Sequence, residues 1–357
     1  LKMVRKFRNS CGIKGIPSMR AMFLDFADDA NTYNLDQQYM FGHSLLVAPV
    51  MNEGETEKAV YLPEGEWIDF WHNALTAGGE TKTYYADVDS IPVYVKNGSI
   101  IPMNLNANYE LGGSIGNDVD NYTNLTFRVY PQGNSSYTVN NSDGTSMEIQ
   151  AMENFDQHKV TVQLPAYDSQ ITTQIFGSRP SSVTANGNEL QQVSSLDEFV
   201  AGTDCFFYNA NEKFTYVKSS VKDAVAICVN GISKAPFEAE HAALTGVSTN
   251  TNHTGYYGEG FVEQFAENGD AVAFTVYEDA EAEKSVVIRY SAGTEDAQRS
   301  ISVNGETVRI SLPKTQDWDT WSEISVPVHV VAGRNTINIC YNEGDFAGIN
   351  LDCIRIE

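Results

Sequence analysis

Residues 300–312 read Ser-Ile-Ser-Val-Asn-Gly-Glu-Thr-Val-Arg-Ile-Ser-Leu. Apolar and polar side chains alternate on both sides of the Asn-Gly pair, as they do in strands that bury one face and expose the other. Asn-Gly also supplies the positive φ angles that a tight hairpin turn requires. The stretch therefore predicts a β-hairpin made of Ser300–Val303 and Val308–Leu312.

The same turn signal recurs along most of the chain. From Leu45 onward, short alternating runs are separated by Asn-Gly or Asp-Gly pairs that begin at residues 97, 143, 186, 230, 268 and 304. Regularly spaced short strands are typical of all-β domains. Boundaries are expected in an Asn- and Gly-rich stretch before residue 124 and near Pro236. The sequence predicts a mainly β protein with segments at 1–44, 45–122, 123–235 and 236–357.

The first segment, residues 1–44, has a different hydrophobic pattern. A helical pattern runs to Gly12, an apolar strand is expected at Ser18–Phe26, and a helix at Asn31–Phe41. Helix, buried strand and helix in succession indicate an α/β layer, which cannot fold alone at this length. Because the chain begins at Leu1 inside a helical pattern, we expect it to be the tail of a longer polypeptide whose targeting signal lies upstream.

The net charge of the chain argues against several classes of binding partner. The 357 residues include 23 Lys and Arg against 47 Asp and Glu, a formal net charge of −24. Such a chain repels phosphate backbones and anionic lipid. No apolar run approaches the ~18 residues that a membrane-spanning helix needs. We therefore expect neither nucleic acid nor a membrane span.

Cysteine and histidine spacing gives little sign of a metal or disulfide framework. Five cysteines occur without a CxxC pair, and none of the six histidines lies four residues from another. Buried thiols are one interpretation; a disulfide between Cys340 and Cys353 on neighbouring terminal strands is the other.

Catalytic signals are also weak. The first segment offers Asp25, Asp28, Asp29 and Asp36, but Asp28 and Asp29 fall where a helix begins, so capping explains them. The sequence contains no nucleophile elbow, P-loop or HExxH motif. We assign no catalytic residue.

Several motifs resemble glycoside hydrolase family 31. Residues 15–26 and 36–50 are similar to the segment that ends the catalytic (β/α)8 barrel of this family and enters its proximal C-terminal β domain. Residues 61–70 and 91–102 resemble strand pairs of that β domain, and residues 125–131 with Ser142-Asp-Gly144 resemble the distal β domain.

This resemblance implies that the chain alone is inactive. Family members use an aspartate nucleophile and an aspartate acid/base on barrel strands that precede this segment, and neither motif occurs here. The parent would be a retaining α-glycosidase. Arg20 and Asp25 are then expected to form a structural pair that braces the barrel.

The last segment suggests a cation site by its own residues. Glu238 and Glu240 are two residues apart and would share one face of a first strand, where like charges repel. Asp352 on the last strand could join them if the two strands are neighbours, and Ca2+ prefers such oxygen ligands. The alternative is a solvated face of an acidic chain.

The surrounding motifs resemble a family 35 carbohydrate-binding module, a β-sandwich with a jelly-roll fold. They are residues 237–240, 255–262, 318–321, 332–335 and 349–354. The resemblance implies a structural Ca2+ held by Glu238, Glu240 and Asp352.

Sugar binding by such a sandwich needs aromatic rings and hydrogen-bonding groups on edge loops. The candidate aromatic residues are Tyr256, Tyr257, Trp318 and Trp321, of which Trp321 is expected to pack inward. Tyr256 and Trp318 are the preferred stacking residues, with Tyr257 as a further candidate. Asn350 and Asp345 are the expected hydrogen-bond partners.

Together these expectations describe a C-terminal fragment of an extracellular or cell-surface bacterial α-glycosidase or α-glucosyltransferase. Its ligand would be an α-glucan oligo- or polysaccharide, and its partner the missing N-terminal barrel. The alternative is a non-enzymatic sugar-binding, spacer or adhesive β protein.

Overall fold

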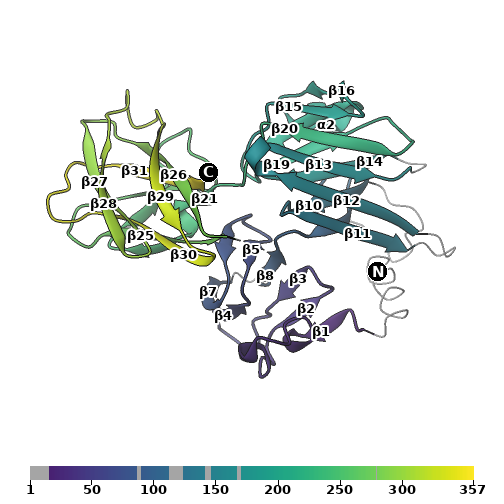
Figure 1. The fold of residues 1–357 in the computed structure, drawn as a ribbon, viewed down its shortest axis with the longest axis horizontal. Helices are drawn as coiled ribbons and strands as arrows, with labels where there is room; N and C mark the ends of the chain where they lie inside the picture. Colours follow the sequence, from purple (N-terminus) through teal and green to yellow (C-terminus); the bar gives the residue numbers. More distant parts are fainter. Residues whose placement is uncertain (1–15, 87–89, 112–123, 141–145, 167–169, 279) are drawn as a thin grey trace. The chain divides into compact units, whose positions relative to one another are not determined.

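Antiparallel strands make up most of the regular structure (Figure 1). The computed structural model describes residues 16–86, 90–111, 124–140, 146–166, 170–278 and 280–357. Two compact units can be distinguished, one formed by residues 1–58 and 84–234 and the other by 59–83 and 235–357. The expectation of a mainly β protein is confirmed.

The start of the first unit is an antiparallel sheet, although an α/β layer was expected. Its strands are ordered β1-β2-β3-β8, with bounds Met19–Ala21, Tyr39–Phe41, Leu45–Val47 and Val93–Lys96. Short 3-10 helices lie between β1 and β2, η1 at Met22–Leu24 and η2 at Ala30–Thr32.

The strand predicted at Ser18–Phe26 is therefore shorter, and the helix predicted at Asn31–Phe41 is wrong. Asp29 caps a single turn by accepting a hydrogen bond from the amide of Asn31. Beyond it, Met40 is buried while Tyr39 and Phe41 are only partly covered, a period of two that belongs to a strand. The helix expected before Gly12 lies outside the described residues.

Arg20 and Asp25 form the expected ion pair. Nε of Arg20 lies 3.3 Å from Oδ2 of Asp25, with the side chains 4% and 12% exposed. His43 donates to the same carboxylate, with 2.7 Å between Nδ1 and Oδ1. The ion pair joins β1 to the end of η1, and His43 connects it to the turn that follows β2.

The larger part of the first unit is a sandwich of two six-stranded sheets. The first is ordered β17-β18-β19-β14-β10-β9, with bounds Gln191–Gln192, Cys205–Asn209, Phe214–Lys218, Ile171–Phe176, Asn124–Val129 and Ile100–Leu105. The second is ordered β11-β12-β13-β20-β15-β16, with bounds Asn134–Asn140, Ser146–Asn154, Lys159–Leu164, Val225–Asn230, Ser182–Ala185 and Asn188–Glu189. Helices α2 (Leu196–Ala201) and η3 (Phe155–Gln157) complete it.

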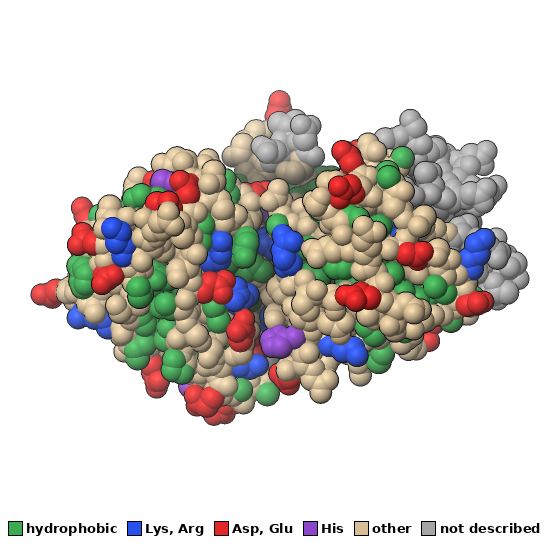
Figure 2. Space-filling view, turned by 90° about the horizontal axis from the view of Figure 1, so that it is seen from above, with side chains coloured by type: hydrophobic (Ala, Val, Ile, Leu, Met, Phe, Trp, Pro, Cys, Tyr) green, Lys and Arg blue, Asp and Glu red, His purple; other side chains and the backbone are tan. Residues whose placement is uncertain are grey.

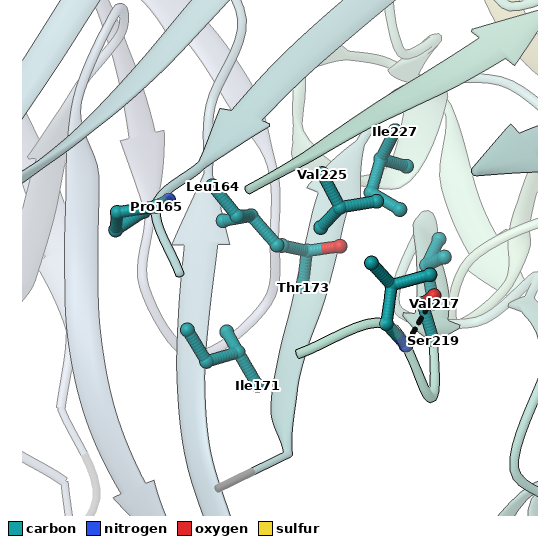
Figure 3. A pocket seen from close by; sticks show the side chains of 9 residues that line it. Leu164, Pro165, Ile171, Thr173, Val217, Ser219, Val225 and Ile227 are labelled. Atoms are coloured by element: carbon teal, nitrogen blue, oxygen red, sulfur yellow. Dashed lines mark hydrogen bonds between the residues drawn. The ribbon is translucent and has the colours of Figure 1, made fainter. Parts of the chain in front are cut away.

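Buried side chains from both sheets form one core in this sandwich, including Phe127, Val129, Ile149, Val160 and Ile175. A pocket opens into this core between Leu164, Ile171 and Val225 (Figure 3). Thr173 and Ser219 supply the hydroxyl groups of an otherwise apolar lining, so the pocket offers no charged group for catalysis. The Asp143-Gly144 turn lies outside the described residues.

Residues 235–357 form a second two-sheet sandwich. One sheet is ordered β23-β24-β31-β26-β29, with β21 paired to β31; the bounds are Ser248–Asn250, Phe261–Glu263, Asn350–Ile356, Ala282–Ser291, Ser322–Val330 and Phe237–Glu238. The other is ordered β22-β25-β30-β27-β28, with bounds Ala243–Thr245, Ala271–Glu278, Gly333–Cys340, Ala297–Val303 and Glu306–Leu312.

The same compact unit includes β5 (Glu66–Asp69) and β6 (Leu75–Ala77), which form a hairpin. Strands β4 (Glu57–Leu62) and β7 (Glu80–Tyr85) pair with each other.

The hairpin that the sequence predicted is present as β27 and β28. Asn304 and Gly305 have φ angles of 51° and 94°, as the turn requires. The proposed Cys340–Cys353 disulfide is wrong: both thiols are free, and they lie on β30 and β31 of opposite sheets.

Charged side chains of both signs lie on the surface. On the face drawn in Figure 2, basic side chains are interspersed among acidic ones over the described residues. No helix in the described part of the chain has both the length and the hydrophobicity to cross a membrane.

The ion pair of Arg20 yields a stability prediction. Replacing Asp25 by Asn should destabilise the β1-β2-β3-β8 sheet by about 3 kcal/mol, because it leaves a buried guanidinium without its counter-charge. Hydrogen exchange measured by mass spectrometry should show faster exchange in peptides that contain β1 and β2. The exposed Asp28→Asn is the matched control; equal protection of those peptides in both variants would contradict the structural role of the pair.

Candidate functional site

The pairing of the first and last strands of the module creates an acidic cluster. Strand β21 runs antiparallel to β31, with Glu238 opposite Cys353. The ligand atoms of Glu238, Asp352 and Cys353 lie within 4.8 Å of one another, and all three residues are buried. The predicted proximity of Glu238 and Asp352 is therefore present in the structure.

Glu240 approaches this cluster by a different route from the one predicted. Strand β21 ends at Glu238, and residues Ala239–His241 form the 3-10 helix η4, so the two glutamates do not share a strand face. Both still converge on Gly258: a Cβ atom added there would lie 2.6 Å from Oε1 of Glu240 and 3.1 Å from Cδ of Glu238. Residue 258 must be small for the two carboxylates to approach in this way.

The loop at 254–260 is fastened to the same carboxylates through its backbone. Oε1 of Glu240 accepts hydrogen bonds from the amides of Glu259 and Gly260, at 2.9 and 3.2 Å. Oδ1 of Asp352 accepts from the amide of Tyr257 at 3.0 Å. The conformation of the loop therefore depends on where these carboxylates lie.

The electrostatics of the cluster favour a cation. Burial, followed by repulsion from Glu238, raises the pKa of Asp352 to about 7, and the ion pair with Arg289 opposes this shift. Burial also raises the pKa of the Cys353 thiol well above its ordinary value. Arg289 pairs with Asp352, and a divalent ion bound by Asp352 and Glu238 would favour the ionised form of both carboxylates.

The donor set fits calcium. Ca2+ takes six to eight oxygen ligands, from carboxylates, carbonyls and water. Glu238, Glu240 and Asp352 would supply carboxylate oxygens, some of which also accept the hydrogen bonds given above. The neutral thiol of Cys353 is a poor ligand for this ion. The role of such an ion would be to hold β21, β31 and the 254–260 loop together.

A second group of side chains surrounds Trp318. Its indole ring lies against Gly293, where an added Cβ would be 2.6 Å from Cγ of the ring, and its Cη2 lies near Gly348. Ser291 donates from its hydroxyl to the carbonyl of Trp318 at 3.0 Å. Glycines beneath a half-buried indole hold the ring in one plane.

Asn350 is linked to the Trp318 segment through Ser291, whose hydroxyl donates to the Trp318 carbonyl. It is paired with Ser291 across β31 and β26, so the two side chains share a face of the sheet. Asn350 is only 3% exposed, and within the described structure its side-chain nitrogen has no hydrogen-bond partner. A buried amide without a partner costs free energy unless a ligand or water accepts its hydrogen bond. This amide is the strongest sign of a binding function at the site.

Tyr256 joins Trp318 through two intervening rings. The centroid of Tyr256 lies 5.7 Å from Phe261, Phe261 lies 5.8 Å from His253, and His253 lies 6.2 Å from Trp318. Sequence reasoning did not identify His253 as a contact of Trp318. Its position shows that the aromatic residues form one continuous group.

Tyr257 and Trp321 have a different partner, the guanidinium of Arg289. Cζ of Arg289 lies 4.0 Å from the Tyr257 ring centroid and 5.2 Å from that of Trp321. Trp321 also donates from Nε1 to the carbonyl of Thr254 at 2.8 Å and packs on Phe261. Trp321 therefore supports the loop, in agreement with its expected inward packing, while Tyr257 is 38% exposed.

Asp345 is held by contacts within the protein. Its buried carboxylate pairs with Nε of Arg309 at 3.0 Å and accepts from Ser300 and from the amide of Asn342. Arg299, whose pKa burial lowers to about 10, holds the following carbonyls of Phe346 and Ala347. This geometry gives Asp345 a structural role in the loop before β31; its predicted contact with sugar stays a prediction.

Two family models match segments of the chain. Residues 15–101 match the family model of the glycosyl hydrolase family 31 C-terminal domain, and residues 235–357 match that of carbohydrate binding module family 35.

Three relatives extend the match. An isomaltosyltransferase of Sporosarcina globispora is 46% identical over 345 residues, which cover 96% of this chain and 32% of that protein. The cycloalternan-forming enzyme of Listeria monocytogenes, solved in complex with a pentasaccharide substrate, is 44% identical with a TM-score of 0.94, covering 98% of this chain and 33% of that one. A Listeria monocytogenes protein solved with α-D-glucose, β-D-glucose, magnesium and calcium is 45% identical with a TM-score of 0.92, covering 96% and 33%.

The chain thus spans about a third of the length of these relatives. The two family models cover the β1-β2-β3-β8 sheet and the C-terminal sandwich. The relatives cover nearly the whole chain. The chain belongs to the proteins that combine a glycosyl hydrolase family 31 C-terminal domain with a family 35 carbohydrate-binding module.

Proposed function

We propose that the module formed by residues 235–357 binds α-linked gluco-oligosaccharides beside Trp318 and that bound calcium strengthens this binding. The observation that carries this proposal is the buried side-chain nitrogen of Asn350, which has no hydrogen-bond partner among the described residues. Asn350 pairs across the sheet with Ser291, whose hydroxyl donates to the carbonyl of Trp318. Trp318 would stack on the apolar face of a glucosyl ring while Asn350 donates to one of its hydroxyl groups. Tyr256 would border the same surface.

The comparisons support the ligand class. The similar proteins include an isomaltosyltransferase and a cycloalternan-forming enzyme. We propose that this chain serves an extracellular or cell-surface bacterial enzyme of the α-glycosidase or α-glucosyltransferase class. The module would tether that enzyme to α-glucan and raise the local concentration of substrate.

The catalytic groups of such an enzyme would lie on an N-terminal barrel that precedes residues 15–101, which match the C-terminal domain. On this proposal the chain alone does not hydrolyse aryl α-glucosides. Turnover by the purified chain above the buffer rate, lost in Asp25→Asn or Asp36→Asn, would contradict it.

Calcium should stabilise the module. Ca2+ at 100 times its dissociation constant adds about 2.7 kcal/mol, because it binds the folded state alone. For a domain of this size, that corresponds to a rise of roughly 10 °C in the melting temperature. The full chain should show this rise in differential scanning calorimetry when calcium replaces EDTA.

Glu238→Gln should abolish most of the calcium-dependent rise, since it removes a charged ligand. The exposed Glu306→Gln, at the β27–β28 turn, should retain it. Equal calcium responses in both variants would place the ion elsewhere.

Sugar affinity should depend on the Trp318 group. One shallow site desolvates little surface, so we expect a dissociation constant nearer millimolar than nanomolar. Trp318→Ala should weaken binding of isomaltotriose by at least about 10-fold, equivalent to ~1.4 kcal/mol, and Asn350→Ala by about 5-fold. Isothermal titration of the full chain measures both.

Trp71→Ala is the matched control, because Trp71 is 44% exposed but lies outside the module's 235–357 range. The binding proposal fails if the full chain shows no affinity for any α-gluco-oligosaccharide, or if Trp318→Ala binds as well as Trp71→Ala does.

A further inference from the structure

Arg289 contacts both the acidic cluster and the 254–260 loop. It lies on β26, beside β31, with its side chain 12% exposed. One guanidinium nitrogen pairs with Oδ2 of Asp352, and the other donates to the carbonyl of Gly255 at 2.8 Å. A single planar group therefore joins a carboxylate of the cluster to the backbone of the loop.

The same guanidinium also fixes aromatic rings. It lies over Tyr257 and close to Trp321, whose indole donates to the carbonyl of Thr254. Gly255, with a φ angle of 84°, brings its backbone against the Trp321 ring: an added Cβ would be 3.2 Å from Cδ1. Arg289 thus contacts Gly255 and Tyr257, while Thr254 is held by Asp319 and Trp321.

Tyr256 lies inside this fixed stretch. Its neighbours on either side, Gly255 and Tyr257, are the residues that Arg289 contacts, and its own ring continues through Phe261 and His253 to Trp318. A shift of Arg289 would move the backbone that carries Tyr256. The acidic cluster and the aromatic group are therefore mechanically connected.

We propose that Arg289 is a positioning residue that couples occupancy of the acidic cluster by a cation to the conformation of the 254–260 loop, and through it to sugar affinity. This inference rests on the proposed function of the module. A cation at Glu238, Glu240 and Asp352 changes the charge that Arg289 faces, and the guanidinium passes that change to Gly255, Tyr257 and Trp321. Binding at each site then favours binding at the other by the same factor.

Only a guanidinium can make all these contacts together. Its planar fork presents several N–H donors at fixed angles and stacks on aromatic faces, whereas a lysine ammonium is a compact point charge. Arg289→Lys keeps a positive charge for Asp352 and gives up the bond to Gly255 or the stacking. This variant separates the coupling from simple charge compensation.

The experiment measures the coupling factor in the full chain. Isothermal titration gives the affinity for isomaltotriose with saturating calcium and with EDTA, and the affinity for calcium with and without isomaltotriose. We expect the wild-type chain to bind sugar about 10-fold more tightly with calcium. In Arg289→Lys both ligands should still bind, with the coupling factor reduced to less than a third of the wild-type value.

Limited proteolysis supplies a readout that does not depend on sugar. A glutamate-specific protease can cut after Glu259, whose side chain is 60% exposed. Calcium should slow this cut in the wild-type chain, and should slow it much less in Arg289→Lys. Mass spectrometry identifies the cut between Glu259 and Gly260.

Arg355→Lys is the matched control. Arg355 is a neighbouring arginine on β31 that forms a forked pair with Glu323, at 2.8 and 2.9 Å. It should keep the wild-type coupling. If Arg289→Lys is too unstable to titrate, Tyr257→Leu replaces it, because this change removes the stacked ring and leaves the Asp352 pair.

The outcomes separate the two proposals. A wild-type chain that binds neither calcium nor sugar contradicts the proposed function. A wild-type chain that binds both without coupling, or an Arg289→Lys variant that keeps more than a third of the coupling factor, overturns the role of Arg289.

Discussion

The pairing of β21 with β31 is the constraint on which the rest of the module depends. It places the first residues of the module against the last strand, so that Glu238 faces Asp352 and Cys353 in a buried environment. Two buried carboxylates in such proximity repel each other and are costly to keep ionised. The fold compensates with Arg289, with backbone amides of the 254–260 loop and, on our proposal, with a calcium ion. A loop held by these groups can present aromatic side chains in a fixed geometry.

The proposed binding surface depends on residues that lie beneath it and hold its side chains in place. Trp318 rests on Gly293 and Gly348, and Ser291 holds its backbone. The loop before β31 is held by Arg299 and Arg309, which engage its carbonyls and Asp345. Sugar sites of this shallow kind desolvate little area, so affinity depends on groups that are already ordered before the ligand arrives. In this respect the polar residues around the site matter as much as the rings that touch sugar.

Local signals in the sequence predicted what is local in the structure. The β27–β28 hairpin follows from Asn304-Gly305 and the alternation around it, and the Arg20–Asp25 pair from an arginine near a carboxylate at a strand end. The helix expected at Asn31–Phe41 failed because one cap at Asp29 starts a single turn, after which burial around Met40 has the period of a strand. The proximity of Glu238 and Asp352 was predictable from a first and a last strand, but the end of β21 at Glu238 was not.

Residues whose roles depend on distant partners escaped prediction. Arg289 sits in an ordinary apolar strand sequence, and its contacts with Gly255, Tyr257 and Asp352 lie more than 30 residues away in either direction. Asp345 was expected to face sugar because its loop carries the right chemistry, whereas Arg309 and Ser300 occupy its carboxylate. Side-chain type indicates a possible ligand contact; only the packing shows which groups the protein has already used.

A crystal structure of the full chain grown with calcium and isomaltotriose tests the account most directly. We predict an anomalous peak between Glu238, Glu240 and Asp352 with oxygen ligands at about 2.3–2.6 Å, and a glucosyl ring stacked on Trp318 within hydrogen-bond distance of Asn350. Calcium bound away from the three carboxylates, or a sugar bound elsewhere with Asn350 still lacking a partner, would contradict it.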